Sequence, residues 1–408
     1  MKIKEFSEIN PSPSCPIQGR HIINYIDTSS VIEGRLYDIQ QLVKTFPSRA
    51  QREIRTQDIL ISSVRPNLKH NYFVEENANG MIASSGFIHI RVKDSTKISP
   101  RFLYYYLTSP SQVNRYIKIA DSSQSAYPSF NKDIIEEIEF PNIDLPTQLR
   151  IAAILGSIDE KIELNRKKIA ELETLAKTIY DYWFVQFDFP DKNGKPYKSS
   201  GGKMVWNEQL KREIPEGWDA GTVGDYVEIH RGASPRPIQN FLSNTGLRWL
   251  KISDATNSNS PYIIEIEDHI RAEGITKTVA LKSGDLVLSN SASPGIPKFL
   301  GVDTCIHDGW LYFPRSEVSY EFLYLYFNKI KPSLIPQGNG SVFKNLKTDI
   351  LKVFPMLKPS QIILDLFDNV IKPIFAEIFL LVKATKETTS LRDSLLPILM
   401  NGQVKVKE

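Results

Sequence analysis

The sequence predicts an α+β protein in which two similar modules, related by pseudo-two-fold symmetry, are separated by two long antiparallel coiled-coil helices. Three observations predict this fold. Landmarks of the first half recur in the same order in the second half, each half has short β-rich runs broken by turn residues, and each half ends in a heptad-patterned helix. The length of 408 residues also favours several domains over one.

The composition excludes a disordered chain and gives no disulfide framework. Hydrophobic residues make up 41% of the chain and charged residues 24%, which is enough apolar material for packed cores. The only two cysteines, Cys15 and Cys305, are typical of a reducing compartment. We find no signal peptide and no run long and apolar enough to span a membrane. We therefore expect a soluble cytoplasmic protein that does not act at a membrane.

The chain contains an internal repeat. Asp58 in DILIS pairs with Asp285 in DLVLS, and Gln148 in PTQ pairs with Gln361 in PSQ. The motifs FLYYYL and FLYLYF lie between these landmarks in the first and second halves. Because the offset falls steadily from 227 to 213 residues, as small loop deletions would cause, the pattern indicates a duplication.

Each copy has the same succession of expected elements. Short strands and turns come first, in runs such as ILISSVRPN and GDLVLSNSASPG. A short helix and a polar loop follow, and a last strand is expected at 135–141 (IEEIEFP) and at 350–355 (ILKVFP). The aromatic side chains of the two short helices are expected in the core rather than stacked on bases, namely Tyr104, Tyr105, Tyr106, Phe322, Tyr324 and Tyr326.

The first long helix is expected at 146–184. Its apolar residues alternate at spacings of three and four, which is the seam of a coiled coil. Asn165 occupies a seam position, where a polar side chain fixes the register at some cost in stability. An ordinary amphipathic core helix is the alternative, although it would show a broader apolar stripe. The seam comprises Leu155, Ile158, Ile162, Asn165, Ile169, Leu172, Ala176 and Ile179.

The second long helix is expected at 359–402, with a seam that can face the first. Pro373 should kink this helix and Pro397 should break its end. The polar, Gly/Ser/Lys-rich segment within 185–214 is expected to be a linker between the two copies. The residues predicted to pair the two helices are Leu155, Ile158, Ile162, Asn165, Ile169 and Leu172 with Ile371, Ile374 and Ile378.

The sequence lacks the common catalytic and metal-binding motifs. No P-loop, dinucleotide-binding glycine motif or nucleophile elbow is present, and the segment SGGKM ends its Gly-Lys pair in Met instead of Ser or Thr. The six histidines and two cysteines do not have zinc-ligand spacing. We therefore expect no catalytic residue, no metal site and no cofactor in this chain.

Two stretches concentrate positive charge. Residues 44–70 hold six basic and two acidic residues, and residues 230–251 hold four basic residues and no acid, so each has a net charge of +4. We expect the two stretches at roughly corresponding places in the copies, as in a reader of two half-sites on one duplex. A solvated basic face is the alternative for either stretch alone. The predicted DNA-binding residues are Lys44, Arg49, Arg52, Arg55, Arg65, Lys69, Arg231, Arg236, Arg248, Lys251 and Asn339.

Polar loop residues are further candidates for reading bases. Gln and Asn can pair bidentately with adenine, which brings in Gln124, Asn131 and Gln337 beside Asn339. For each of them, a turn residue that bonds to its own backbone is the favoured alternative.

Several segments resemble one protein family. Residues 146–190, beginning PTQLRIAAILGSIDEKIELNRKKIAELE, resemble the central conserved helix region of the specificity subunit of type I restriction-modification systems. Residues 212–237, REIPEGWDAGTVGDYVEIHRGASPRP, resemble the opening of a target recognition domain in that family, and PILMNGQVKV resembles its C-terminal end. The first module departs from the family pattern because it lacks an IPEGW-type opening and begins MKIKEFSEIN.

The resemblance implies a domain plan and a function. The chain would be a non-catalytic DNA-recognition subunit in which each target recognition domain reads one half of a bipartite target. The two helices would set the gap and dock two methyltransferase subunits, which use S-adenosylmethionine to methylate adenine. The implied domains are 1–145 (N-terminal target recognition domain), 146–184 (central conserved spacer helix), 185–214 (linker), 215–358 (C-terminal target recognition domain) and 359–402 (C-terminal conserved spacer helix).

The resemblance also implies partners and leaves alternatives. Double-stranded DNA, the methyltransferase subunits and restriction/translocase subunits are the implied partners, and S-adenosylmethionine, ATP and Mg would be bound by those subunits and not by this chain. The alternative function is a stand-alone sequence-specific DNA-binding or scaffolding protein without enzyme partners. An enzyme with an unrecognised active site is a further alternative, which would act on DNA alone.

Overall fold

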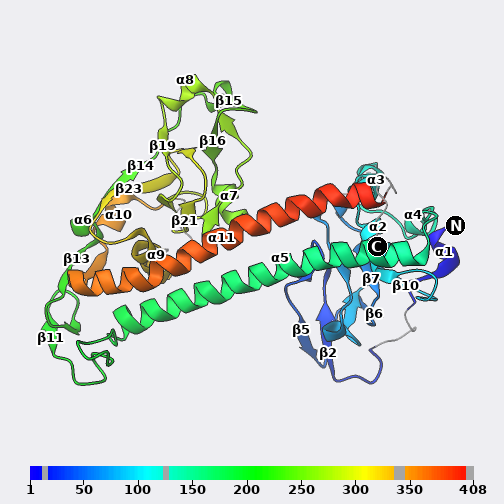
Figure 1. The fold of residues 1–408 in the computed structure, drawn as a ribbon, viewed down its shortest axis with the longest axis horizontal. Helices are drawn as coiled ribbons and strands as arrows, with labels where there is room; N and C mark the ends of the chain where they lie inside the picture. Colours follow the sequence, from blue (N-terminus) through cyan, green and yellow to red (C-terminus); the bar gives the residue numbers. More distant parts are fainter. Residues whose placement is uncertain (12–16, 123–127, 335–344, 401–408) are drawn as a thin grey trace. The chain divides into compact units, whose positions relative to one another are not determined.

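The computed structural model describes residues 1–11, 17–122, 128–334 and 345–400. The chain divides into two compact units, which we call unit 1 (Met1–Ile162 with Thr388–Glu408) and unit 2 (Glu163–Glu387). Each unit contains β-sheets, short helices and part of each of two long helices, so the expected α+β class is confirmed (Figure 1).

The main sheet of unit 1 is antiparallel throughout. β7 can lie in its middle because all four of its residues are buried, as in a strand covered on both faces. The helices α2 (Pro100–Leu107) and α3 (Pro110–Asp121) belong to the same core, which includes Phe102 and Tyr116. The strands lie in the order β1 (Ser7–Ile9), β10 (Phe87–Val92), β7 (Ile59–Ser62) and β8 (Asn71–Phe73).

A second sheet of unit 1 is mixed. β2 runs parallel to β9, whereas β5 and β6 pair antiparallel at the two ends of the sheet. A short ribbon of β3 (Val31–Ile32) and β4 (Arg35–Leu36) lies between β2 and β5 in the chain. The strands lie in the order β5 (Gln40–Val43), β2 (Ile22–Ile26), β9 (Ile82–Ser84) and β6 (Ala50–Glu53).

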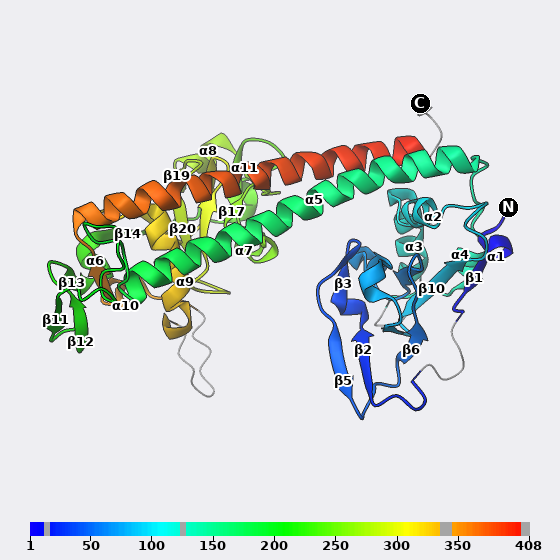
Figure 2. The same cartoon turned by 60° about the horizontal axis from the view of Figure 1, so that its bottom comes forward.

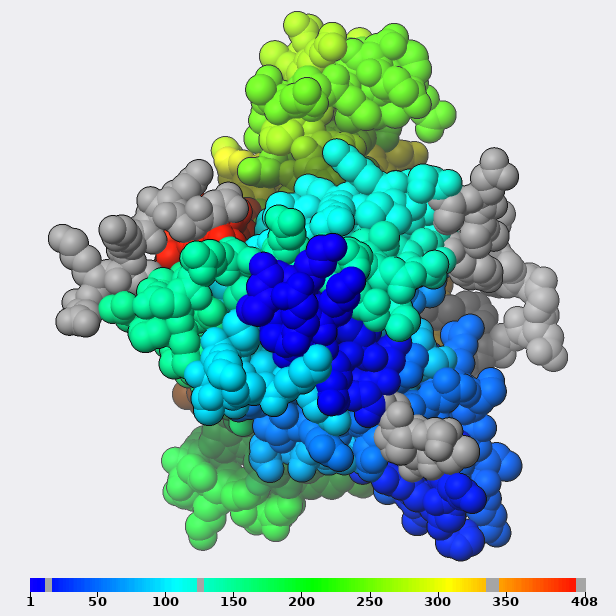
Figure 3. Space-filling view, turned by 90° about the vertical axis from the view of Figure 1, so that its right-hand side faces the viewer, coloured from blue at the N-terminus to red at the C-terminus, as the bar shows by residue number. Residues whose placement is uncertain are grey.

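The beginning of the chain completes unit 1. After Met1, the helical turn α1 (Ile3–Phe6) leads into β1, which pairs with β10. The amide of Ile3 donates to the carbonyl oxygen of Ile138 at 3.1 Å, and the amide of Phe140 donates to that of Met1 at 2.9 Å. Figure 3 shows these first residues, in dark blue, packed among cyan and teal parts of unit 1. The outer strand of the main sheet is thus formed without an IPEGW-type opening.

Unit 2 also has two larger sheets. The main sheet is antiparallel except at β17, and the second sheet pairs β16 parallel to β22. The main sheet has the order β14 (Val227–Arg231), β23 (Trp310–Ser316), β20 (Leu286–Ser289), β21 (Pro297–Leu300) and β17 (Tyr262–Ile263). The second sheet has the order β15 (Leu242–Ser243), β18 (His269–Ile270), β16 (Leu247–Leu250), β22 (Thr304–Ile306) and β19 (Val279–Leu281). The short helices are α6 (Val223–Tyr226), α7 (Ile252–Asn257), α8 (Ala272–Ile275) and α9 (Tyr320–Leu334).

The strand pairings confirm the duplication. In unit 1 the strands β1, β2, β5, β6, β7, β8, β9 and β10 have the same chain order and the same partners as β14, β16, β18, β19, β20, β21, β22 and β23 in unit 2. Single hydrogen bonds repeat as well: Ser63 N donates to Gly86 O at 3.0 Å, and Asn290 N donates to Gly309 O at 2.9 Å. The two units therefore share one backbone frame.

The expected last strand of each copy is largely wrong, because only an isolated bridge at Glu139 falls in 135–141 and only Pro355 of 350–355 lies in a strand. Asp133–Glu136 forms the helical turn α4, and Thr348–Lys352 forms α10. An aspartate in the first turn of each favours the start of a helix at that point. The apolar residues Ile134, Ile135 and Ile138 fit helical as well as strand spacing. In unit 2 the extended part begins only at Pro355, where β24 (Pro355–Lys358) pairs with β13 (Asp219–Thr222).

The two long helices are α5 (Leu145–Tyr180) and α11 (Gln361–Met400), which lie side by side in opposite directions (Figures 1 and 2). In unit 1, Arg392 Nη1 lies 3.2 Å from Asp159 Oδ1. In unit 2, Lys168 Nζ lies 2.6 Å from Glu377 Oε1. As the numbering rises along α5 it falls along α11, which is the expected antiparallel pairing.

Neither proline interrupts α11. The helix continues through Pro373 and Pro397 to Met400, so the prediction that Pro397 breaks its end is wrong. Proline removes one backbone donor but does not end a helix whose apolar residues are held by tertiary packing. Leu396, Leu399 and Met400 are buried in the core of unit 1 and hold this last part of the helix.

The segment after α5 is folded and not a loose tether. A π-helical turn (Asp181–Val185) follows α5, and the strands β11 (Met204–Asn207) and β12 (Arg212–Pro215) form a hairpin. Phe189 stacks on Tyr197 and on Trp218, with ring centres 4.6 and 5.1 Å apart. Aromatic burial of this kind fixes the segment to unit 2, although its middle is polar.

The aromatic residues of the two short helices lie where the sequence placed them. Tyr104, Tyr105, Phe322 and Tyr326 are buried, whereas Tyr106 and Tyr324 are half-buried against the same cores. The prediction that they belong to the core is confirmed.

Candidate nucleic-acid interface

The first predicted basic residues surround the second sheet of unit 1. Lys44 follows β5 and Arg49 precedes β6, and both side chains are exposed. Within the described part of the chain, neither forms an ion pair. Arg52 lies in β6 and is half-buried, and this burial lowers the pKa of its guanidinium. Lys44 and Arg49 therefore offer their charges to a polyanion more readily than Arg52.

The remaining candidates of unit 1 follow β6. Arg55 is exposed, and Lys69 Nζ lies 2.9 Å from Glu33 Oε1. Arg65 has a left-handed backbone conformation with φ at 49°, and its amide donates to Pro128 O at 2.8 Å. Because a left-handed residue turns the chain sharply, Arg65 stands at a corner directly beyond β7.

The landmark Asp58 has a structural role. The carboxylate is 1% exposed and accepts hydrogen bonds from Arg91 Nε at 2.8 Å and from the Arg55 amide at 2.7 Å, and its Oδ2 lies 2.6 Å from His89 Nε2. Burial raises the pKa of Asp58, but the hydrogen bonds from Arg91 and His89 outweigh it, so the pKa lies below its usual range. In unit 2 the landmark Asp285 likewise accepts from the Lys282 amide, at 2.8 Å. The repeat at this position preserves a turn rather than a reader of DNA.

In unit 2, Asp308 contacts two of the candidates, Arg231 at the end of β14 and Arg236 in the loop after it. Arg231 Nε donates to the Asp308 carbonyl oxygen at 2.5 Å, and Arg236 Nη2 lies 3.7 Å from Asp308 Oδ2. Ser234 Oγ donates to Asp308 Oδ1 at 2.7 Å, and this hydrogen bond lowers the pKa of Asp308. Both arginine side chains remain more than half exposed. The carboxylate thus stays ionised and holds the loop that carries both arginines.

The last two candidates of unit 2 are engaged elsewhere. Arg248 Nη1 donates to Ile266 O at 2.5 Å, and Lys251 Nζ lies 3.0 Å from Asp268 Oδ2. These contacts tie β16 and the residue that follows it to the segment before β18. Both cations therefore have structural partners, whereas no described residue forms an ion pair with Lys44 or Arg49.

The two basic stretches do not occupy corresponding places. The stretch 44–69 runs from the end of β5 to the start of β8, which in the frame of unit 2 corresponds to the part from β18 to β21. The stretch 230–251 instead corresponds to the part of unit 1 from β1 to β2. The expectation failed because every landmark used to align the copies lies at or after Asp58 and Asp285.

Some candidates lie outside the described residues, and others were missed. Gln124, Gln337 and Asn339 are not among the residues that the structure describes, and Asn131 is exposed next to Phe130. Sequence reasoning overlooked Asp308 because a single acidic residue gives no signal in a count of positive charge.

The residues predicted to pair the two helices are buried or half-buried in the unit to which each belongs. Leu155 and Ile162 are buried in unit 1, and Ile169, Ile371 and Ile378 are buried in unit 2. Ile158, Leu172 and Ile374 are half-buried. Asn165 is 2% exposed, and its Nδ2 has no hydrogen-bond partner among the described residues.

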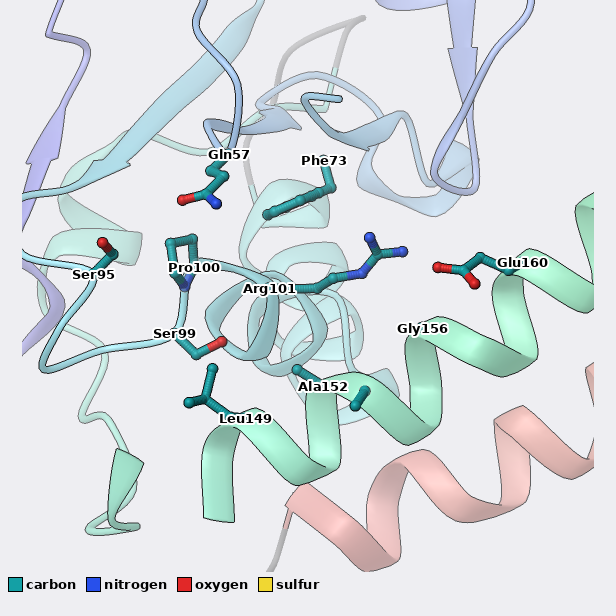
Figure 4. A pocket seen from close by; sticks show the side chains of 11 residues that line it. Gln57, Phe73, Ser95, Ser99, Pro100, Arg101, Leu149, Ala152, Gly156 and Glu160 are labelled. Carbon is teal, nitrogen blue, oxygen red and sulfur yellow. The ribbon is translucent and has the colours of Figure 1, made fainter. Parts of the chain in front are cut away.

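A cavity of about 470 Å³ lies in unit 1 between the start of α2 and the first half of α5 (Figure 4). Arg101 crosses it in the direction of Glu160, with its guanidinium carbon 5.3 Å from the centre of the Phe73 ring. A Cβ at Gly156 would lie 3.4 Å from Arg101 Nε, so the glycine leaves room for this side chain. We assign no ligand to the cavity.

The described residues offer no group of three or more His, Cys, Asp or Glu side chains that could hold a metal ion. Over the same residues, no helix is both long and apolar enough to cross a membrane.

The chain is similar to known proteins in sequence and in fold. The family model described as "Type I restriction modification DNA specificity domain" matches residues 1–174 and 215–377. The chain is 24% identical to the Type I restriction enzyme HindI specificity subunit of Haemophilus influenzae, over 93% of this chain and 94% of that protein. It is 23% identical to the Type I restriction enzyme MjaIX specificity subunit of Methanocaldococcus jannaschii, over 91% of this chain and 86% of that protein.

A solved structure agrees in fold. The crystal structure of a Type-I restriction-modification system S subunit from M. genitalium matches with a TM-score of 0.59, at 14% identity, over 98% of this chain and 95% of that one. At this identity the likeness concerns the fold alone.

Proposed function

Because this chain belongs to the family of type I restriction-modification DNA specificity subunits, which form the non-catalytic part of such systems, we propose that each of its units reads one half of a bipartite DNA target. The observation that carries the proposal is the duplication. The family model matches two segments, and each segment contains one copy of the backbone frame. Two copies of one reader suit a target made of two separated half-sites.

The long helices are proposed to set the gap between the half-sites. α5 has 36 residues, which at about 1.5 Å per residue gives a rod of about 54 Å. One turn of DNA is about 34 Å long, so a rod of this length is sufficient to span adjacent turns. Pairing with α11 stiffens the rod, because the buried residues of both helices share the cores of the units.

The helices are also proposed to dock two methyltransferase subunits. In unit 2, Ile362, Leu366 and Val370 follow one another at spacings of four on α11 and are 71%, 42% and 42% exposed. An exposed apolar ridge of this kind is typical of a surface that another protein covers. The methyltransferase subunits would supply S-adenosylmethionine and adenine chemistry, and restriction/translocase subunits would supply ATP and Mg.

An insertion in the helix pair tests the gap. We insert four residues after Leu172 in α5 and four after Ile374 in α11, close to the part of α11 that faces Leu172, so that both partners lengthen together. The rod gains about 6 Å. The adenines methylated by the complex with its methyltransferase subunits are then mapped by sequencing. We expect both half-sites unchanged and a gap longer by about two base pairs, since each strand rises about 3.4 Å per nucleotide.

The control places the same four residues in the exposed turn between β11 and β12, which is expected to leave the gap unaltered. An unchanged gap in the double-insertion variant, with methylation retained, would contradict the spacer role. A chain that binds its DNA site but never co-purifies with a methyltransferase subunit would instead favour the stand-alone DNA-binding protein.

A further inference from the structure

The two units share one turn around which arginines gather. It joins β9 to β10 in unit 1, at Ser84–Gly86, and β22 to β23 in unit 2, at His307–Gly309. We call this turn, with the residues that contact it, the corner of each unit. In both units the residue at the end of the main-sheet strand β7 or β20 closes the corner from one side, through Ser63 N to Gly86 O and through Asn290 N to Gly309 O.

In unit 1 the corner brings Arg49 and Arg65 to one place. Ser85 N donates to Arg49 O at 2.7 Å, which fixes Arg49 directly beside the turn. Arg65 follows Ser63 by two residues and leaves β7 at the left-handed bend described above. Both side chains are exposed. Two cations are thus anchored to the same turn through the backbone.

In unit 2 the same turn is flanked by Arg231 and Arg236. Gly232 N donates to Trp310 O at 2.9 Å, so the segment after β14 runs along the turn. A Cβ at Gly232 would lie 2.2 Å from His307 O, and glycine is therefore required for this close approach. Asp308, in the turn itself, contacts both arginines as described above.

The arginines come from non-equivalent segments. In unit 1 they precede β6 and follow β7, whereas in unit 2 Arg231 is the last residue of β14 and Arg236 follows that strand. The position of Arg65 in the frame is occupied by Ala292 in unit 2, which has the same left-handed conformation, with φ at 57°. The corners of the two units therefore carry arginines at different positions of the shared frame. Arginines that were only inherited from a duplicated ancestor would occupy the same positions in both units.

Unit 2 also offers a buried acceptor at its corner. Asn290 is 2% exposed, and its Nδ2 donates to Asp308 O at 3.2 Å. Its Oδ1 has no partner among the described residues. A buried polar atom left unpaired costs about 1 to 3 kcal/mol, and this oxygen can accept a hydrogen bond from a ligand that reaches the corner.

We propose that the corner is where each unit contacts DNA, with Arg49 and Arg65 in unit 1 and Arg231 and Arg236 in unit 2 binding backbone phosphates. Asp308 is a positioning residue that aims the two arginines of unit 2. This inference rests on the proposed function and narrows it, because it selects four of the ten predicted basic residues. The remaining six basic residues are expected to contribute less to DNA binding.

The salt dependence of DNA binding tests the corner. The full chain and its variants are titrated with a 40-base-pair duplex of random sequence at several salt concentrations. Each lost phosphate contact lowers the slope of log K against log salt by about 0.9. We expect the double variant R231Q/R236Q to lose about 1.8 from this slope, and R49Q/R65Q to lose the same. The matched controls are R315Q, at the opposite end of β23 from the corner, and K93Q, just beyond the opposite end of β10.

Asp308→Asn separates positioning from simple charge. Removing a negative charge near DNA would by itself strengthen DNA binding. Loss of the contacts that orient Arg231 and Arg236 would weaken it. We expect weaker binding, with the thermal unfolding midpoint unchanged. Stronger binding would overturn the positioning role.

The outcomes distinguish the corner from the function. If the unaltered chain shows no salt-dependent binding to the duplex, the proposed function itself fails. If it binds and the corner variants keep the slope of the controls, the corner is refuted while the function stands. If a double variant has a lower melting temperature than its control, the salt slope of the single variant R236Q tests the corner instead. The Arg236 side chain is 83% exposed and contributes little to folding.

Discussion

Replacing Glu173 by glutamine should remove a pH dependence from the stability of unit 2. Glu173 lies on α5, and it interacts with Lys298 on β21, whose side chain is 7% exposed. Lys298 Nζ donates to Ser258 O at 2.7 Å and also to Ser260 O. Burial raises the pKa of Glu173 to about 7 and lowers the pKa of Lys298 to about 8. Burial thus outweighs the attraction between the two charges.

The magnitude follows from the pKa of Glu173. The rise from 4.5 to about 7 corresponds to at most about 3.5 kcal/mol, at about 1.4 kcal/mol per pKa unit. Because the folded-state pKa lies above the unfolded one, the contribution of Glu173 is fully present below pH 4.5 and is lost as the pH rises through about 7. A glutamine side chain at this position would not titrate. The variant should therefore lose less stability than the unaltered chain between pH 5 and pH 7.5.

Lys298 does not reverse this sign within that range. Its folded-state pKa is lowered, so its own contribution is present above pH 10.5 and is lost as the pH falls through about 8. Over most of the range it is charged in both folded and unfolded chains. Other titrating groups are common to the compared chains and cancel.

Urea unfolding followed by tryptophan fluorescence measures the effect. The unfolding midpoint of the unaltered chain should fall from pH 5 to pH 7.5 by more than that of the Glu173→Gln variant. Glu171→Gln is the control, because Glu171 is exposed on the same helix two residues earlier. If the two variants show the same pH profile, the burial of Glu173 does not govern its titration and the reasoning is refuted.

Two further substitutions test the packing of the long helices. Asn165→Leu should stabilise the chain by about 1 to 3 kcal/mol, because the buried Nδ2 lacks a partner among the described residues. The control is Asn369→Leu, at an exposed position of α11. A lower melting temperature for Asn165→Leu than for this control would contradict the prediction. Phe367→Ala should destabilise the chain by about 3 to 5 kcal/mol, since this fully buried ring packs edge-on against Tyr180. Leu366→Ala, at the exposed neighbouring position, should change the melting temperature little. Equal effects of the two substitutions would contradict the packing of Phe367 between the helices.

The sequence predicted the two long helices and the repeat because their signals are periodic or local. The heptads of α5 and α11 and the repeated landmarks at Asp58 and Asp285 each depend on a few residues. The start of the strand expected at 135–141 was assigned wrongly because Ile134, Ile135 and Ile138 fit two periodicities, and tertiary contacts decide between them. Pro397 was misjudged for a similar reason, since the packing of Leu396 and Leu399 outweighs one lost hydrogen bond.

The candidate interface was less accessible to sequence reasoning. Counting charges along the chain groups Arg55 with Arg65, yet Arg55 belongs to the turn of Asp58 and Arg65 to the corner. Conversely, Arg49 and Arg65 meet at the corner only because Ser85 and Ser63 fix their segments to one turn. Proximity made by strand pairing has no counterpart in the linear order of residues.

The way the corner is built also separates stability from recognition. The hydrogen bonds that close it, from Ser63 to Gly86 and from Asn290 to Gly309, use backbone atoms and tolerate different side chains, as the exchange of serine for asparagine shows. The exposed arginines contribute little to the cores and can be moved from one segment to another without loss of the frame. A duplicated reader of this design can change what one unit contacts while both units keep the same fold, which is what independent recognition of two half-sites requires.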